Sequence, residues 1–261
     1  GAGGSENAYY INGYFSSDPL SNLGGFSLPY GSIEQQETYT GGYSARYGRS
    51  DGGVINQVGK SGSNEVHFGG QVTIRPKSLY ANQKDIYYPN LDFSEANSNP
   101  NIPINPDTGT KYQYAYTTPE LAGTLFTPNS QDERWTNTMS GYFSGPLIKD
   151  RLFAFVSAEA EWTYANTTPT AGGTSSTHNK TTDPKVYAKI NWNITDNHLL
   201  EYTYLHEDEQ RRGRLYSYDF DARKEGAQLD NAFPDEQKTE SEFSILKHTG
   251  YLTDTMTLNA L

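Results

Sequence analysis

The residues best suited to chemistry in this chain do not form a known catalytic or metal-binding pattern. Gly53 to Ser61 approximates a phosphate-binding loop, but its glycines are separated by five residues instead of four, and a strand pattern follows. No serine, histidine and aspartate are arranged at a nucleophile turn, and no carboxylate pair is marked as that of a glycosidase. The histidines lie in separate segments without metal-ligand spacing. The sequence therefore predicts no enzyme activity, no metal and no cofactor.

The composition excludes several classes of protein. Hydrophobic residues make up 34% of the 261 residues, below the roughly 45–50% of a typical globular chain. Yet the chain has 21 Tyr, 11 Phe and 3 Trp, too many aromatic residues for disorder. A net charge of −11 argues against nucleic acid as a partner, and the absence of Cys excludes a disulfide scaffold. No apolar run approaches the ~20 residues of a membrane-spanning helix. Few aliphatic and many aromatic residues favour β-strands with one apolar face.

Apolar and polar residues alternate with a period of two in several segments, which predicts strands. The clearest is the segment that begins at Leu152, where Val156 and Trp162 share one face while Glu159 and Glu161 share the other. Segments of the same kind cover residues 64–75, 135–146, 186–194, 200–204 and 239–252.

Short and long connections alternate between these strands. The long polar stretches are 76–134, 165–184 and 211–238, and the short turns are 147–151, 195–198 and 253–255. An up-and-down antiparallel sheet with all long loops at one end gives this order, as in outer-membrane barrels. We expect residues such as Phe68, Val156 and Trp192 to face lipid and the polar face to line a lumen. The alternative is a water-soluble β-sandwich with its tryptophans at the centre.

The first long loop is rich in tyrosine, asparagine and aspartate. Tyrosine rings beside amide groups suit the binding of sugars or peptides at an exposed face. The alternative is a gating loop that packs on itself. The candidate substrate-facing residues are Tyr80, Tyr87, Tyr88, Tyr112 and Tyr114.

Short motifs in the first 75 residues become specific through their order and spacing. They are Tyr9-Tyr-Ile-Asn-Gly13, Thr40-Gly-Gly-Tyr-Ser-Ala45, Tyr47-Gly48-Arg49, Gly52-Gly-Val-Ile-Asn56 and Lys60-Ser-Gly62. They resemble the C-terminal half of the plug of TonB-dependent outer-membrane transporters, and most of all the Oar-like group. The stretch from Gly141 to Glu159 resembles a barrel hairpin of the same group. Asn12 stands where Asp is common, and Gly59 stands where the group carries Thr, a change we expect to be minor.

The resemblance implies an all-β fold, a partial (open) transmembrane antiparallel β-barrel with part of an N-terminal plug domain. Residues 1–63 would be the C-terminal half of the plug, and residues 64–261 the first strands of the barrel, about seven in number. It also implies active substrate uptake across the bacterial outer membrane. The implied partners are outer-membrane lipid, an unidentified extracellular substrate and the TonB energy-transducing complex, which contacts a more N-terminal segment in the family. The plug-motif residues with a structural or gating role would be Gly41, Gly42, Tyr47, Gly48, Arg49, Gly52, Gly53 and Asn56.

Other interpretations remain open at this point. A secreted or surface-exposed β-rich adhesin, or a glycan- or peptide-binding module, would also use long acidic loops rich in tyrosine. Both ends of the chain look internal, so we expect a piece of a longer protein. Arg46 and Arg49 could pair with lumen carboxylates such as Glu159, Glu161 or Glu201, or lie in solvent. We also expect residues 8–60 to lie on the concave, polar side of an open sheet.

Overall fold

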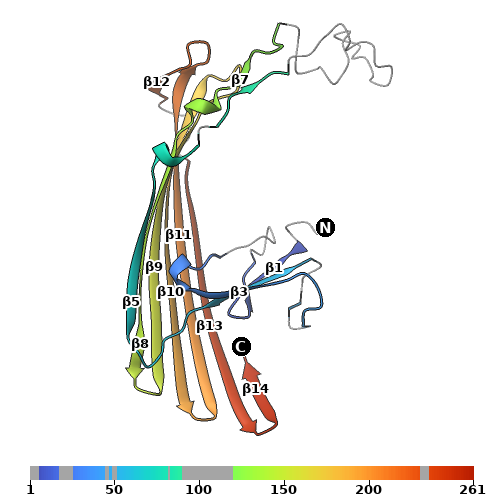
Figure 1. Ribbon diagram of the computed structural model, residues 1–261, viewed down its shortest axis with the longest axis vertical. Coiled ribbons are helices and arrows are strands. Elements are labelled where there is room, and N and C mark those ends of the chain that lie inside the picture. The colour runs from blue at the N-terminus through green and yellow to red at the C-terminus, as the bar shows by residue number, and fades with distance from the viewer. Residues whose placement is uncertain are drawn as a thin grey trace, which may run out of the picture.

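In the computed structural model, a tall curved sheet forms a wall, and a smaller sheet lies against its concave side (Figure 1). The structure describes residues 6–17, 26–44, 47–48, 52–81, 83–89, 120–229 and 235–261. Within these ranges the regular elements are strands and three short 3-10 turns, at Tyr30–Ser32 (η2), Lys77–Leu79 (η3) and Asn129–Gln131 (η5). No helix in this part of the chain is long and apolar enough to cross a membrane.

The smaller sheet, which we call the inner sheet, has four short strands in the order β2-β1-β4-β3. They are β1 (Ala8–Ile11), β2 (Tyr14–Phe15), β3 (Ile33–Tyr39) and β4 (Val54–Gly59). Strands β1 and β4 are parallel, and the other two pairs are antiparallel. Side chains of Ala8, Tyr10, Tyr47 and Val54 form a buried cluster within it. Because each strand is short, its apolar residues appear in the sequence only as brief bursts.

The larger sheet, which we call the wall, follows the chain order with antiparallel neighbours throughout. Its strands are β5 (His67–Arg75), β8 (Arg134–Ile148), β9 (Leu152–Thr167), β10 (Ser175–Thr195), β11 (His198–Asp219), β13 (Asp235–Thr253) and β14 (Met256–Ala260). Strand β12 (Lys224–Gln228) pairs with the end of β11. A separate two-stranded sheet joins β6 (Ile86–Tyr87) to β7 (Leu125–Thr127).

The two faces of the wall differ as the alternation predicts. On the outer face Phe68, Val156 and Trp192 leave 79%, 45% and 44% of their surface exposed. On the inner face Phe155 and Tyr187 are 2% and 0% exposed, because the inner sheet covers them. Among the described strands no second sheet covers the outer face. The β-sandwich alternative is therefore wrong, and the apolar face is open to its surroundings.

The two ends of the wall differ in the length of their connections. Tight turns at 149–151, 196–197 and 254–255 lie at the lower end in Figure 1, and the longer connections emerge at the upper end, near β7 and β12. This separation confirms the predicted topology. The predicted limits of two long loops are wrong, because β10 begins at Ser175 and β11 continues to Asp219. In these upper parts of the strands the ladder continues while the apolar alternation fades, because polar side chains suit both faces once water lies on each side.

Three connections at the upper end are hydrogen-bonded to one another. Asp132 accepts hydrogen bonds from the backbone N–H and the hydroxyl of Thr168, both at 2.8 Å. The neighbouring Gln131 accepts a hydrogen bond from the Tyr218 hydroxyl and donates one to the Arg223 carbonyl. The start of β8, the β9–β10 connection and the end of β11 therefore form one layer above the wall.

Candidate gating site between the inner sheet and the wall

The turn between β1 and β2 brings the inner sheet into direct contact with the wall. Asn12 has φ 51° and Gly13 has φ 83°, left-handed values that asparagine and glycine adopt more readily than other residues. The Asn12 amide nitrogen donates to Thr203 Oγ1 at 3.2 Å and to Tyr187 Oη at 3.4 Å. Its amide oxygen accepts the Gly59 N–H at 2.9 Å. One side chain therefore connects β4 of the inner sheet to β10 and β11 of the wall.

Tyr187 makes the second connection between the two sheets. Its side chain is fully buried, and its hydroxyl donates to the Lys60 carbonyl at 3.2 Å. The Lys60 ammonium in turn donates to the Gly31 carbonyl at 2.9 Å and lies 5.5 Å from the centre of the Tyr142 ring. The segment that follows β4 is thus held by backbone and side-chain contacts before the chain enters β5.

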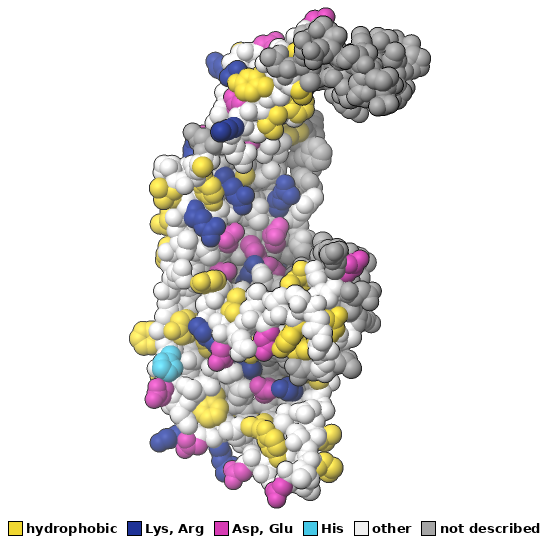
Figure 2. Space-filling model, turned by 45° about the vertical axis from the view of Figure 1, so that its right-hand side comes forward, with side chains coloured by type: hydrophobic (Ala, Val, Ile, Leu, Met, Phe, Trp, Pro, Cys, Tyr) yellow, Lys and Arg dark blue, Asp and Glu magenta, His cyan; other side chains and the backbone are white. Residues whose placement is uncertain are grey.

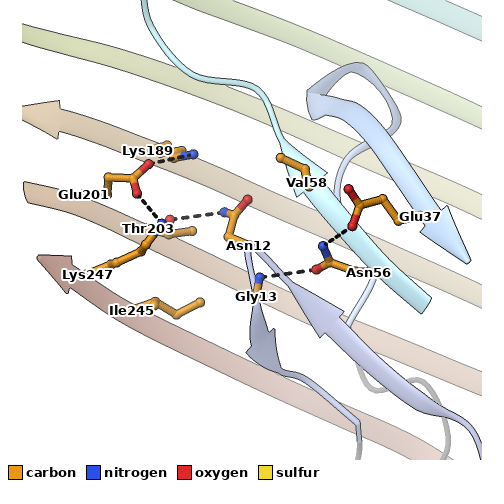
Figure 3. Close-up of a pocket in the computed structure, with 10 residues that line it drawn as sticks. All are labelled: Asn12, Gly13, Glu37, Asn56, Val58, Lys189, Glu201, Thr203, Ile245 and Lys247. Carbon is orange, nitrogen blue, oxygen red and sulfur yellow. Dashed lines mark hydrogen bonds and ion pairs between the residues drawn. The ribbon is translucent and has the colours of Figure 1, made fainter. Parts of the chain in front are cut away.

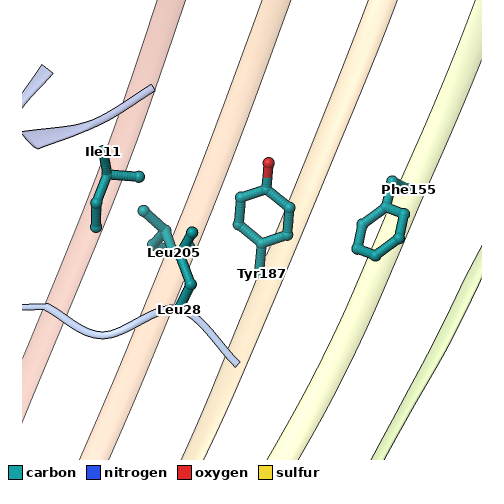
Figure 4. Packing of buried hydrophobic residues seen from close by; sticks show 5 residues of the cluster. All are labelled: Ile11, Leu28, Phe155, Tyr187 and Leu205. Carbon is teal, nitrogen blue, oxygen red and sulfur yellow. The ribbon is translucent and has the colours of Figure 1, made fainter. Parts of the chain in front are cut away.

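Apolar side chains close the space around these hydrogen bonds (Figure 4). Ile11 and Leu28 pack against Phe155, Tyr187 and Leu205, which come from the three consecutive wall strands β9, β10 and β11. Each of the five is 4% exposed or less. Burial of apolar surface from both sheets removes water from the contact. We call these five residues the seal.

A polar cavity of about 280 Å³ lies beside the seal, on the side of the short turns (Figure 3). In its wall Glu201 forms ion pairs with Lys189 at 3.4 Å and with Lys247 at 3.0 Å. On the inner-sheet side Asn56 donates to Glu37 at 3.1 Å. Acidic and basic groups balance one another in this lining, so the cavity can hold water without an excess of either charge.

A second charged group lies on the opposite side of the seal, toward the long loops. Lys185 pairs with Asp183 at 3.0 Å and with Glu207 at 3.1 Å, and it donates to Ser27 Oγ at 2.6 Å. Figure 2 shows acidic and basic side chains gathered on the wall above the inner sheet. The seal is therefore an apolar layer with charged groups of the wall on both sides of it.

The glycines of the predicted plug motif shape the edge of the inner sheet. Gly53 donates to Asn7 Oδ1 at 2.8 Å, and a Cβ at Gly53 would lie 3.2 Å from that oxygen and from the Tyr39 carbonyl. Gly52 donates to the Glu6 carbonyl at 3.0 Å. Gly42 has a left-handed backbone with φ 67°. Gly41 has no such angle, and a Cβ there would meet open space. These glycines serve close backbone approach and a left-handed turn.

The remaining motif residues divide between the inner sheet and the polar cavity. Tyr47 is buried and stacks edge-to-face on Tyr10, whose hydroxyl donates to the Gly48 carbonyl at 2.8 Å. Asn56 is 4% exposed, lines the polar cavity and accepts the Gly13 N–H at 3.3 Å. Arg49 lies outside the described residues.

The predicted substrate-facing tyrosines that the structure describes have different surroundings. Tyr80 meets Thr136 Oγ1 at 3.5 Å near the top of the wall. Tyr88 packs on Phe126 in the small β6–β7 sheet, and Tyr87 of β6 is 53% exposed. Tyr112 and Tyr114 lie outside the described residues. Of the three described tyrosines, Tyr88 packs against another loop residue, and whether any of them meets a substrate stays a prediction.

Sequence reasoning missed the joint that Asn12, Gly59, Tyr187 and Thr203 form. The Asn12-Gly13 pair signals a left-handed turn, but nothing in the sequence links it to a strand 175 residues away. The expectation that Gly59 is a minor change is wrong, since its hydrogen atom faces the Tyr187 ring.

The lumen carboxylates have partners other than the expected arginines. Glu201 pairs with Lys189 and Lys247, and Glu159 accepts the Tyr30 N–H at 3.1 Å. Arg46 and Arg49 themselves lie outside the described residues.

Known proteins resemble this chain in part of its sequence and in its architecture. No family model matches the chain. Over 81 residues, which are 31% of this chain and 8% of the relative, it is 37% identical to the TonB-dependent transporter Oar of Myxococcus xanthus. Its fold superposes on the outer membrane transporter YddB of Escherichia coli with a TM-score of 0.58 and 14% identity. The chain is a homologue of the TonB-dependent outer-membrane transporters.

The homology gives a physical meaning to the exposed outer face of the wall. A TonB-dependent transporter resides in the outer membrane, where lipid covers the apolar face of its strands. The superposition covers 95% of this chain but 29% of YddB, so the chain spans under a third of that transporter. The open antiparallel sheet matches this part of such a fold.

Proposed function

We propose that the inner sheet is the C-terminal half of a plug and that the wall is the first part of a barrel in an active importer of the outer membrane. Substrate would bind from the outside, and the TonB complex would supply the energy through a more N-terminal plug segment. The observation that carries this proposal is the seal. A separate four-stranded sheet is held by hydrogen bonds and apolar packing on the inner face of a wall whose outer face is apolar.

The exposed outer face favours this function over a secreted adhesin or glycan-binding module. Val66, Phe68, Val72 and Ile74 lie on one face of the first wall segment and are each 59–79% exposed. A water-soluble module would bury such a row, because contiguous exposed apolar surface promotes association. In lipid the same row is stabilising.

Import through this site requires the seal to open. The Asn12 side chain must release Thr203, Tyr187 and Gly59, and Ile11 and Leu28 must leave the wall. Each hydrogen bond contributes about 0.5–1.5 kcal/mol net, so a few such bonds hold the closed state and a mechanical pull can break them. Opening would connect the polar cavity below the seal with the charged group above it.

A cross-link between the two sheets tests the proposal, and none of the 261 residues of this chain is a Cys that would compete for the linker. In the full-length transporter, Asn12→Cys and Thr203→Cys are joined by a short thiol-reactive linker that reduction can cleave. A transported substrate is first found by screening candidate peptides, glycans and siderophores for uptake that depends on TonB. We expect cross-linking to lower that uptake at least tenfold and reduction to restore it.

The two single-cysteine variants serve as controls, and the linker should not lower the uptake of either variant relative to the same variant without linker. Undiminished uptake by a fully cross-linked protein would show that the seal does not open during transport. Uptake of every candidate without dependence on TonB would show that the chain does not belong to an active importer.

A further inference from the structure

A second cavity, of about 390 Å³, lies on the inner sheet and differs in chemistry from the polar cavity beside the seal. Aromatic rings, amides and hydroxyls line it, including those of Tyr9, Phe26, Ser27, Gln36 and Gln57. No charged side chain is among the described residues of its lining. We call it the upper cavity.

The upper cavity lies across the inner sheet from the polar cavity. Along β4, Ile55 and Gln57 border the upper cavity, whereas Asn56 and Val58 border the polar one, and alternate residues of a strand point to opposite faces. Ser27 of the upper cavity contacts Lys185, which lies nearer the long-loop end of β10 than Tyr187 does. The upper cavity therefore lies on the side from which an extracellular ligand arrives.

One polar atom of this cavity lacks a partner within the described chain. The Gln57 amide nitrogen donates to Gln36 Oε1 at 3.2 Å, so the two amides form a pair. The Gln57 Oε1 atom is buried and accepts no hydrogen bond. A buried acceptor without a donor costs about 1–3 kcal/mol, so a ligand hydroxyl that reaches this atom when the amide pair shifts recovers this free energy.

From these features we propose that the upper cavity binds a neutral carbohydrate of one or two sugar rings, an inference that rests on the proposed import function. Sugar hydroxyls both donate and accept hydrogen bonds, which matches a lining of amides and hydroxyls. The flat apolar faces of sugar rings match the faces of Tyr9 and Phe26. A volume of about 390 Å³ lies in the range of small-molecule pockets.

The lining disfavours an anionic ferric chelate in this cavity. Burial of a charged ligand requires paired charges or several charge-assisted hydrogen bonds. The nearest cation on the wall is Lys185, and Asp183 and Glu207 already neutralise it. A peptide would find the aromatic rings but no charged group for its termini in the described lining.

Binding to the purified full-length transporter in detergent tests the proposal without any need for TonB. A printed array of neutral glycans is screened, and the best glycan is measured by calorimetry. Both Gln57→Leu and Gln36→Leu should weaken its binding at least tenfold. Gln35→Leu, a matched change of the adjacent residue, which is not part of the cavity lining, should leave binding within twofold.

The outcomes separate this inference from the proposed function. Absence of binding to every neutral glycan, or binding that both amide variants leave unchanged, overturns the upper cavity as a carbohydrate site. Tight binding of a peptide or a ferric catecholate that Gln57→Leu abolishes also overturns it. TonB-dependent uptake measured in cells then reports on the import function alone. Gln36 is exposed on β3, so Gln36→Leu should fold. It therefore still tests the cavity if Gln57→Leu fails to fold.

Discussion

Gly59 of the inner sheet and Tyr187 of the wall fit each other without room for a further atom. A Cβ at Gly59 would overlap the Tyr187 hydroxyl and lie 2.5 Å from Cζ of the ring. Tyr187 is fully buried and cannot move aside without leaving the seal. The glycine therefore lets the inner sheet approach the wall closely enough for Asn12 to reach both Tyr187 and Thr203.

We expect Gly59→Ala to separate the inner sheet from the wall. Overpacking of a buried contact costs about 1–3 kcal/mol, and the shift also stretches the Asn12 hydrogen bonds. The measurement is protease sensitivity of the inner sheet in the full-length protein, which should rise. The double variant Gly59→Ala/Tyr187→Ala should lose less free energy of unfolding than the sum of the losses in the two single variants, because removal of the Tyr187 ring also removes the overlap.

Gly41→Ala is the matched control for this experiment, since Gly41 has open space around it and an ordinary backbone conformation. It should leave the protease pattern unchanged. A Gly59→Ala protein as resistant as the unaltered one would show that the two sheets do not meet as closely as described.

The strands of the wall were predictable from sequence because each has one apolar and one polar face. The alternation from Leu152 to Trp162 reports the local environment of a single strand, so no tertiary knowledge is needed to interpret it. The same reasoning failed for the upper ends of the strands, toward the long loops. Residues 175–184 and 211–219 form strands but are mostly polar and lack a regular apolar alternation, and polar residues alone do not distinguish a strand from a loop.

The contact between the inner sheet and the wall was hidden from sequence reasoning for a different reason. Asn12, Gly59 and Tyr187 meet only because of how the inner sheet lies against the wall, and no single-strand pattern encodes that placement. The motif glycines were easier to identify, since turns such as the one at Gly42, with φ 67°, are locally determined.

Glu201→Gln should lower the free energy of unfolding more than Lys247→Met, although both residues line the polar cavity. Glu201 is the common partner of Lys189 and Lys247, and Lys189 is 8% exposed, so loss of the carboxylate leaves a buried cation unpaired. We expect a cost of about 1.5–3 kcal/mol for Glu201→Gln. Lys247 is 40% exposed, and its loss should cost about 0–1 kcal/mol. Urea unfolding in detergent micelles measures the difference, and equal costs would contradict the shared-partner geometry.

Acid should loosen the contact between Asp85 and η5 at the upper end of the wall. The Ser130 N–H donates to Asp85 Oδ1 at 2.8 Å and holds the pKa of this carboxyl below its usual value of 3.8. A lowered pKa in the folded state means that the contribution is complete above pH 3.8 and is lost as the pH falls through the folded-state pKa. NMR titration of the Asp85 carboxyl should show the lowered midpoint, and Asp85→Asn should remove the acid sensitivity of the Ser130 amide signal.

Thiol labelling in intact cells should distinguish the two ends of the wall. Cysteine introduced at Thr170, in the exposed β9–β10 connection, should react with a membrane-impermeant maleimide. Cysteine at Asn197, in the turn between β10 and β11, should react only after the outer membrane is permeabilised. Labelling of Asn197→Cys from outside would reverse the proposed orientation.

Val156→Arg probes whether lipid covers the outer face. Val156 is 45% exposed near the middle of the apolar alternation from Leu152 to Trp162 in β9, and it pairs with Phe143 on one side and Ala188 on the other. An arginine near the middle of a lipid-facing strand costs about 2–4 kcal/mol, because the bilayer does not solvate the charge. Thr170→Arg, at the exposed upper end, should cost almost nothing. Refolding of the full-length protein into lipid vesicles, with and without each change, gives the two free energies. Equal values would mean that water rather than lipid meets Val156, since a charge on a solvated strand face carries no such penalty.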